Sequence, residues 1–186
     1  KPEEIEQIKR AKYIDELKWI VAHERRNKFI SKLAKSVKGN TLVLFNYVDL
    51  HGKPLYKLIT EMCPDKKVFM IYGGTDVQQR EEIRQIVDKE KDAILVASYG
   101  TCSTGINIKN IHNIIFTSPS KSVIRVLQSI GRGLRRSESK DSMKLYDLAD
   151  NLSHKKYRNH TMRHLDARIK IYTKEHFDYK LISMKI

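Results

Sequence analysis

Cysteines are scarce and long apolar runs are absent from this sequence, and acidic residues are fewer than basic ones. The two cysteines, Cys63 and Cys102, lack the close spacing of metal-binding pairs, so each is expected to be a packing residue in a reducing cytosol. No apolar run approaches about 20 residues, so no membrane-spanning helix is expected. The opening residues 1–4 do not resemble a signal peptide. The expected location is therefore the cytoplasm, with no membrane partner.

Basic residues greatly outnumber acidic ones. The 36 Lys and Arg against 22 Asp and Glu give a formal net charge of +14, and the pI is about 9.7. This excess indicates a polyanionic partner, with nucleic acid favoured over an acidic membrane surface. A hydrophobic content of 40% is enough for a buried core, and 186 residues suit one domain with a small appendage.

Short apolar runs alternate with helical patterns through residues 39–148. The expected buried strands are 41–47, 68–72, 93–97, 112–117 and 142–148. Helices are expected between them, for example at 52–62 and 77–87. This alternation predicts an α/β domain built from βαβ units, with a parallel sheet flanked by helices on both faces.

Helices are also expected on both sides of this domain. Residues 1–38 are predicted to be an N-terminal helical lead-in, because apolar residues recur near the helical period over 3–37, with one break within 10–24. Asp15 and Glu16 are expected to be surface acids of this amphipathic segment.

Residues 149–186 are predicted to be a basic helical tail in which cations and aromatic residues are interleaved. The cations are Lys155, Lys156, Arg158, Arg163, Arg168, Lys170 and Lys174, and the aromatic residues are Tyr157, Tyr172, Phe177 and Tyr179. Such interleaving suits neutralisation of a nucleic-acid backbone together with base stacking. A packed aromatic core with solvated lysines is the alternative. His160 and His164 stand four residues apart but lack a third ligand nearby, so no metal site is expected.

The segment 128–136 concentrates glycine and arginine. Gln128, Arg132 and Arg135 fall at i, i+4 and i+7, on one face of a helix that Ser118 is expected to cap. Guanidinium groups bind phosphate oxygens bidentately and stay charged, so this face suits a phosphate chain. The spacing leaves a solvated basic helix end open as an alternative.

The pattern formed by Gln128, Gly131, Arg132 and Arg135 resembles motif VI of the superfamily 2 helicases, Q-x-x-G-R-x-x-R. In that family the motif lies on the second of two RecA-like domains and faces ATP bound to the first domain. The resemblance implies that Arg132 and Arg135 act on the γ-phosphate with help from Gln128, and that Gly131 lies at the ATP.

The preceding segments resemble helicase motifs IV and V, in the family order. The strand and helix over 41–62 resemble motif IV, which makes Asn46 an expected nucleic-acid contact. Thr104 to Asn107 resemble the T/S-x-x-G-I-D part of motif V, although the family more often has Asp where Asn107 stands. This likeness implies that Gly105 and Asn107 contact ATP and that Thr104 contacts nucleic acid.

The remaining nucleic-acid contacts that the resemblance implies lie in loops and in the tail. They are Gly73, Gly74, Ser98, Lys155, Lys156 and Arg158. For Gly73 and Gly74 the alternative is an ordinary turn. For Ser98 the alternative is a hydroxyl that satisfies the backbone of its own loop.

The resemblance covers about residues 23–186 and extends to phage recombination and repair helicases and to RecG and XPB-type helicases. It implies a RecA-like fold and an ATP-dependent DNA helicase or translocase. The expected substrate is branched or single-stranded DNA in recombination, repair and replication, in the bacterial host cytoplasm if the protein is phage-encoded.

Neither a G-x-x-x-x-G-K-[ST] phosphate loop nor an acceptable Asp-Glu magnesium box occurs in the sequence. Phosphoryl transfer depends on both elements. ATP and Mg²⁺ are therefore expected to bind mainly on a first RecA-like domain that this chain lacks, and the chain alone is expected to be inactive. An RNA helicase motor domain and a non-catalytic basic nucleic-acid-binding domain are the alternative functions.

Overall fold

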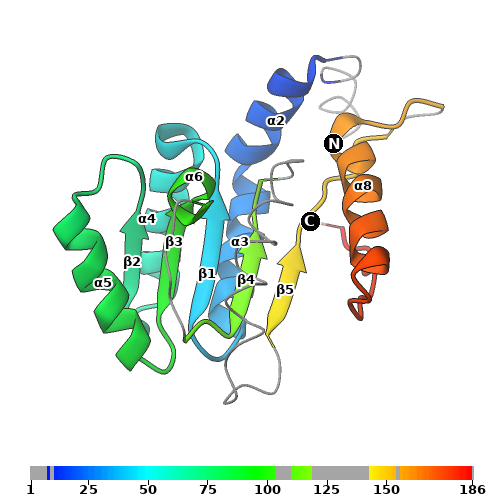
Figure 1. Ribbon diagram of the computed structural model, residues 1–186. Helices are drawn as coiled ribbons and strands as arrows, with labels where there is room; N and C mark the ends of the chain where they lie inside the picture. The colour runs from blue at the N-terminus through cyan, green and yellow to red at the C-terminus, as the bar shows by residue number, and fades with distance from the viewer. Residues whose placement is uncertain (1–7, 9–10, 104–109, 119–142, 154–155, 186) are drawn as a thin grey trace.

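The computed structural model describes residues 8, 11–103, 110–118, 143–153 and 156–185 (Figure 1). Five strands form one parallel sheet in the order β2-β3-β1-β4-β5. They are β1 (Thr41–Phe45), β2 (Val68–Ile71), β3 (Ile94–Ser98), β4 (Asn113–Phe116) and β5 (Lys144–Asp147). The predicted parallel α/β sheet is therefore confirmed.

The lead-in contains α2 (Tyr13–Ala22) and α3 (Glu24–Ser36), which are separated at His23, within the range 10–24 where one break was expected. Ala11 and Lys12, between the helical Ile8 and α2, also lie outside any helix, so the lead-in is interrupted more than once. His23 has extended backbone angles, and its ring nitrogen Nδ1 accepts a hydrogen bond from the backbone N–H of Arg26 (3.4 Å), which caps α3. The other helices are the π-helical turn η1 (Val48–Gly52), α4 (Lys53–Met62), α5 (Val77–Lys89), α6 (Tyr99–Ser103) and α8 (His160–Lys174). Within the described ranges, no helix combines the length and apolar character needed to cross a membrane.

Apolar side chains cover both faces of the sheet, because successive residues of a strand point to opposite sides. Leu42 and Leu44 of β1 belong to the core on the face covered by α5. Val43 and Phe45 belong to the core on the other face, which α3 and α4 cover. Figure 1 shows α8 beyond β5, at the side of the sheet, so the tail helix extends the domain laterally.

Two local expectations need correction. Ser98 was expected to lie in a loop, but it is the last residue of β3, and the residues directly after it form α6. In the tail, α8 ends at Lys174, and residues 177–185 contain no helix. The helical content of the tail is therefore smaller than predicted.

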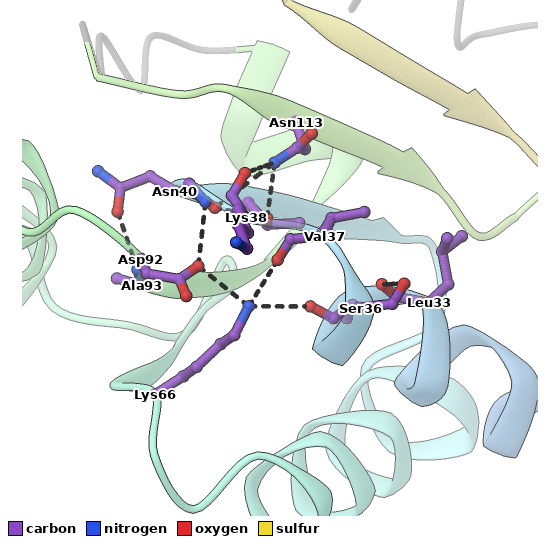
Figure 2. Close-up of polar contacts among 12 residues, drawn as sticks. Leu33, Ser36, Val37, Lys38, Asn40, Lys66, Asp92, Ala93 and Asn113 are labelled. Carbon is purple, nitrogen blue, oxygen red and sulfur yellow. Dashed lines mark hydrogen bonds and ion pairs between the residues drawn. The ribbon is translucent and has the colours of Figure 1, made fainter.

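A network of polar groups closes the amino end of the sheet (Figure 2). The Asn40 side chain accepts a hydrogen bond from the backbone N–H of Ala93 (2.8 Å). Lys66 donates from Nζ to the Val37 carbonyl (2.7 Å) and forms an ion pair with Asp92 (3.0 Å). These groups satisfy one another, so they hold the strand starts together.

Candidate functional site

The loops that leave the carboxyl ends of parallel strands meet at one edge of the sheet, where α/β proteins commonly bind ligands. Asn46 directly follows β1, Gly73 follows β2, Ser98 ends β3, and Ser118 follows β4. The fold therefore brings these residues, distant in sequence, to the same edge. Asn46 is half-buried there.

All residues predicted to act on ATP lie outside the described residues, so their roles stay predictions. They are Gly105, Asn107, Gln128, Gly131, Arg132 and Arg135. Two predicted nucleic-acid contacts, Thr104 and Lys155, also lie outside the described residues. The described residues show how the segments that lead into them are anchored.

The Gly73–Gly74 turn is fixed by hydrogen bonds from neighbouring residues. Arg80 on α5 donates from Nε to the Thr75 carbonyl (2.8 Å) and from Nη2 to the Gly73 carbonyl (3.0 Å). The Thr75 hydroxyl accepts from the backbone N–H of Tyr72 (3.0 Å). A Cβ atom at Gly73 would meet no atom within 4 Å, and its φ is not left-handed, so the described part of the fold does not require glycine there. A bare, exposed backbone at this place permits close approach by another molecule.

The Ser98 hydroxyl is engaged inside the protein. Ser98 is 9% exposed, and its Oγ lies 2.7 Å from the hydroxyl oxygen of Thr101. The same Oγ accepts a hydrogen bond from the backbone N–H of Thr101 (3.3 Å) at the start of α6. Ser98 therefore satisfies the backbone of its own loop, which is the alternative to a nucleic-acid contact. Contact of Ser98 with a phosphate stays a prediction, and it requires the Ser98 hydroxyl to donate to the phosphate rather than to Thr101.

Ser118 is bonded from two sides by residues that the sequence analysis did not single out. The Tyr99 hydroxyl donates to the Ser118 carbonyl (3.2 Å), and the Ser118 Oγ lies 3.3 Å from Nδ1 of His51. Burial, with a smaller effect of the Arg26 charge, lowers the pKa of His51 to about 3, so its ring is neutral near pH 7. Burial, followed by the Asp147 charge, raises the pKa of Tyr99 well above its usual value.

Two buried arginine–aspartate pairs lie beside this edge. Arg26 Nε is 2.8 Å from Asp150 Oδ1, and Arg168 Nε is 2.7 Å from Asp147 Oδ2. Tyr172 also donates to Asp147 (2.8 Å). The Nη1 and Nη2 atoms of both arginines are buried and have no hydrogen-bond partner among the described residues. Since Arg168 is fully buried, grouping it with exposed tail cations was wrong.

Glu16 was expected to be a surface acid, and this prediction was wrong. Its side chain is 0% exposed, whereas Asp15 is exposed as expected. The Glu16 carboxylate accepts hydrogen bonds from the backbone N–H groups of His160 (3.0 Å) and Thr161 (2.9 Å), at the start of α8. A negative charge is favourable at a helix N-terminus, where the N–H groups lack intrahelical partners.

The tail cations fall into different environments. Lys156 is exposed, but Arg158 forms paired hydrogen bonds with Asp166 (2.8 and 2.6 Å), which offset its charge. The guanidinium carbon of Arg163 lies 5.6 Å from the centroid of the Tyr157 ring. Lys170 and Lys174 are also exposed on α8. Tyr172 is buried and is therefore a core residue, as the alternative interpretation of the tail aromatics holds.

The two tail histidines contact an aromatic ring of the lead-in. The rings of His160 and His164 lie 6.0 and 4.7 Å from the Tyr13 ring, centroid to centroid. Within the part of the chain that the structure describes, no group of three or more His, Cys, Asp or Glu residues could hold a metal ion.

Comparisons with known proteins agree with this fold. Residues 24–137 match the family described as the helicase conserved C-terminal domain. The chain is 35% identical over 192 residues to the ATP-dependent DNA helicase UvsW of Enterobacteria phage T4. The aligned region covers 96% of this chain and 38% of UvsW. The crystal structure of T4 UvsW matches with a TM-score of 0.81 and 35% identity over 97% of this chain and 38% of that one. The C-terminal domain of the DEAD-box protein Dbp5 shares the fold, with 12% identity and a TM-score of 0.61 over 83% of this chain and 82% of that one.

These matches confirm the resemblance to the second RecA-like domain of superfamily 2 helicases, as well as the predicted RecA-like fold. The chain spans 38% of the length of T4 UvsW. It belongs to the helicase conserved C-terminal domain family.

Proposed function

We propose that this chain is the second motor domain of an ATP-dependent DNA helicase or translocase that acts on branched DNA in recombination, repair and replication. The similarity to the ATP-dependent DNA helicase UvsW over 96% of the chain is the observation that carries this proposal. The convergence of the candidate loops at the carboxyl edge of the sheet supports it, as does the net charge of +14. The protein would act in the cytoplasm, that of a bacterial host if it is phage-encoded.

ATP and Mg²⁺ would bind mainly to a first RecA-like domain. The sequence of this chain contains neither the phosphate loop nor the acidic box whose backbone, carboxylate and hydroxyl groups hold the phosphates and the metal in such motors. Gly105, Asn107 and Gly131 would complete the nucleotide site from this chain. Bound ATP supplies the phosphoanhydride whose cleavage drives the motor.

Arg132 and Arg135 would act on the γ-phosphate, with Gln128 assisting. Negative charge spreads over the oxygens of the transferring phosphoryl group, and a desolvated guanidinium offsets this charge most strongly at the transition state. Closing of the two domains on ATP and reopening after hydrolysis would move this domain along a DNA strand.

The DNA strand would run along the carboxyl edge. The fixed, bare backbone at Gly73 suits close contact with a phosphate, and Gly74, Asn46, Ser98 and Thr104 would contribute from the same turn and from neighbouring loops. Lys155, Lys156 and Arg158 would extend the track into the tail. Binding of this kind has no base specificity and weakens with salt.

The test is steady-state ATP hydrolysis by a fusion that joins this chain to a first RecA-like domain. Arg132→Ala and Arg135→Ala should each lower turnover by about 10³-fold, the low end for such arginines, because each arginine can replace the other in part. Lysine at either position should rescue poorly, since an ammonium group lacks the planar fork. Gln128→Ala should be milder because no charge is lost.

Arg84→Ala is the matched control, because Arg84 lies on α5 and pairs with Glu81 and Asp88. Thermal melting checks that each variant is folded. Turnover near the parental level in both folded motif VI variants would contradict the assignment and favour the non-catalytic basic domain. The unfused chain should hydrolyse no ATP. Competition between matched DNA and RNA forks for the fusion separates the DNA helicase from the RNA helicase alternative.

A further inference from the structure

Ser118 is a junction between segments that are distant in sequence. Its carbonyl accepts a hydrogen bond from Tyr99, and its hydroxyl lies within hydrogen-bonding distance of His51. Tyr99 begins α6 directly after β3, and His51 belongs to η1 after β1. Ser118 itself directly precedes residues 119–142, which contain the predicted arginine fingers. The junction therefore ties two loops of the carboxyl edge to the start of the arginine-bearing segment.

Packing alone does not explain why polar side chains occupy this buried junction. Tyr99, His51 and Ser118 are all buried, and a buried polar group costs free energy unless it is hydrogen-bonded. The Tyr99 ring already packs against Phe116, at a centroid distance of 5.9 Å, and phenylalanine would fill that space. The Tyr99 hydroxyl adds a directional hydrogen bond to the Ser118 carbonyl. This bond fixes the position of the Ser118 backbone relative to α6, which filling the same space with an apolar ring would not do.

The junction also adjoins the residue predicted to touch a nucleic-acid phosphate. Ser98 immediately precedes Tyr99, and its hydroxyl is bonded to Thr101 inside the first turn of α6. A phosphate oxygen accepts a hydrogen bond, so its contact with Ser98 would take the Ser98 hydroxyl proton and leave Thr101 as the donor in the Ser98–Thr101 pair. Because Ser98 and Tyr99 are adjacent, a change in the first turn of α6 would move the Tyr99 hydroxyl relative to the Ser118 carbonyl.

We propose that Tyr99 and His51 are positioning residues that transmit nucleic-acid contact at the loop after β3 to the arginine-bearing segment through Ser118. This inference rests on the proposed function and adds a physical route between its two sites. Coupling between two sites is a free energy. The loss of the Tyr99 hydrogen bond should therefore lower the coupling by no more than the net free energy of one hydrogen bond. The link to His51 does not titrate near neutral pH, because its lowered pKa keeps that buried ring uncharged there.

The experiment compares Tyr99→Phe with Tyr172→Phe in the fusion with a first RecA-like domain. Both tyrosines are buried to a similar extent, at 5% and 6% exposure, and each loses one hydroxyl hydrogen bond, but Tyr172 bonds to Asp147 and not to Ser118. The measurements are kcat and KM for ATP with and without a forked DNA, the Kd for that DNA, and the melting temperature. Tyr99→Phe should lower the DNA-stimulated kcat, and the ratio of stimulated to basal kcat, by about two- to tenfold. KM and Kd should stay unchanged, and Tyr172→Phe should retain the parental ratio.

Ser118→Ala is a second variant, since it removes the hydroxyl that faces His51 and leaves the carbonyl that Tyr99 bonds. It should lower the same ratio. Parental ratios in Tyr99→Phe and Ser118→Ala would overturn the inference. An equal loss in Tyr99→Phe and Tyr172→Phe, in step with their melting temperatures, would also overturn it and assign a packing role. If Arg132→Ala abolishes turnover while Tyr99→Phe matches the parent, only this inference fails. If Arg132→Ala retains turnover, the proposed function itself fails.

Discussion

Glu16 and Asn159 stand 143 residues apart in the chain and meet in a buried hydrogen bond of 2.9 Å from Asn159 Nδ2 to Glu16 Oε1. The same carboxylate binds the first backbone N–H groups of α8. The lead-in and the tail helix are therefore joined through one side chain. Because α2 supplies the charge that caps α8, the position of the tail relative to the sheet depends on a residue near the other end of the chain.

Loss of the Glu16 carboxylate should destabilise the protein. Glu16→Ala leaves the N–H groups of His160 and Thr161 buried without their acceptor, so the free energy of unfolding should fall by about 2 to 4 kcal/mol. Glu16→Gln keeps one acceptor oxygen and should lose less. Urea denaturation measures the change. Asp15→Ala, at the exposed neighbouring position, is the control and should stay within about 0.5 kcal/mol of the parent. Equal effects at the two positions would contradict the capping role.

The buried Arg168–Asp147 pair should matter far more to stability than the exposed Arg158–Asp166 pair. Arg168→Ala leaves a largely buried carboxylate uncompensated and should cost about 3 to 5 kcal/mol of unfolding free energy. In the other pair the side chains are 50% and 46% exposed, so Arg158→Ala should cost less than about 1 kcal/mol. Both pairs include a residue of α8, which makes them a matched comparison by urea denaturation. Similar losses in the two variants would show that burial does not govern these pairs.

The buried neutral ring of His51 should make folding sensitive to acid. Its pKa falls from 6.5 to about 3 in the folded chain, so between these values the unfolded chain binds more protons. Stability is thus full above the unfolded-state pKa and falls as the pH drops towards 3, by at most about 1.36 kcal/mol per pH unit from this group.

The check is urea denaturation at a series of pH values between these two pKa values. His51→Gln should show a shallower loss of stability with falling pH than the parent. His176→Asn is the control, since His176 is exposed and its positive φ of 55° is tolerated by asparagine. An unchanged slope in His51→Gln would mean that another group sets the acid sensitivity.

The start of the tail should contribute to DNA binding by this chain. Replacing Lys155, Lys156 and Arg158 together by Ala should weaken binding. It should also flatten the plot of log affinity against log salt, by about 0.7 to 0.9 for each phosphate that the protein no longer neutralises. Asp166→Asn should strengthen binding, because it frees Arg158 from its ion pair.

Fluorescence titrations with single- and double-stranded DNA at several salt concentrations measure both effects. The control is the triple alanine variant of Lys35, Lys38 and Lys91, which are exposed near the amino end of the sheet and carry the same formal charge as the three tail residues. An equal loss of affinity in the two triple variants would indicate that net charge alone governs binding. Parental affinity in the tail variant would make the tail a packing element.

Local sequence patterns were enough to predict the parallel α/β architecture and a helical lead-in before it. The alternation of apolar runs and amphipathic helices reports which face of each element is buried, so these features need no knowledge of distant segments. The same patterns predicted a strand over 41–47, of which the structure forms Thr41–Phe45, since a strand buried on both faces is a nearly continuous apolar run.

The burial of individual polar groups, in contrast, depends on the tertiary structure. Glu16 and Arg168 look like surface residues in their own helices, and their burial depends on the helix N-terminus of α8 and on Asp147. The same holds for the hydroxyl of Tyr99, whose acceptor lies 19 residues further along the chain. A charge or hydroxyl is buried where a partner compensates its lost hydration, and that partner is set by the packing of distant segments rather than by the local sequence.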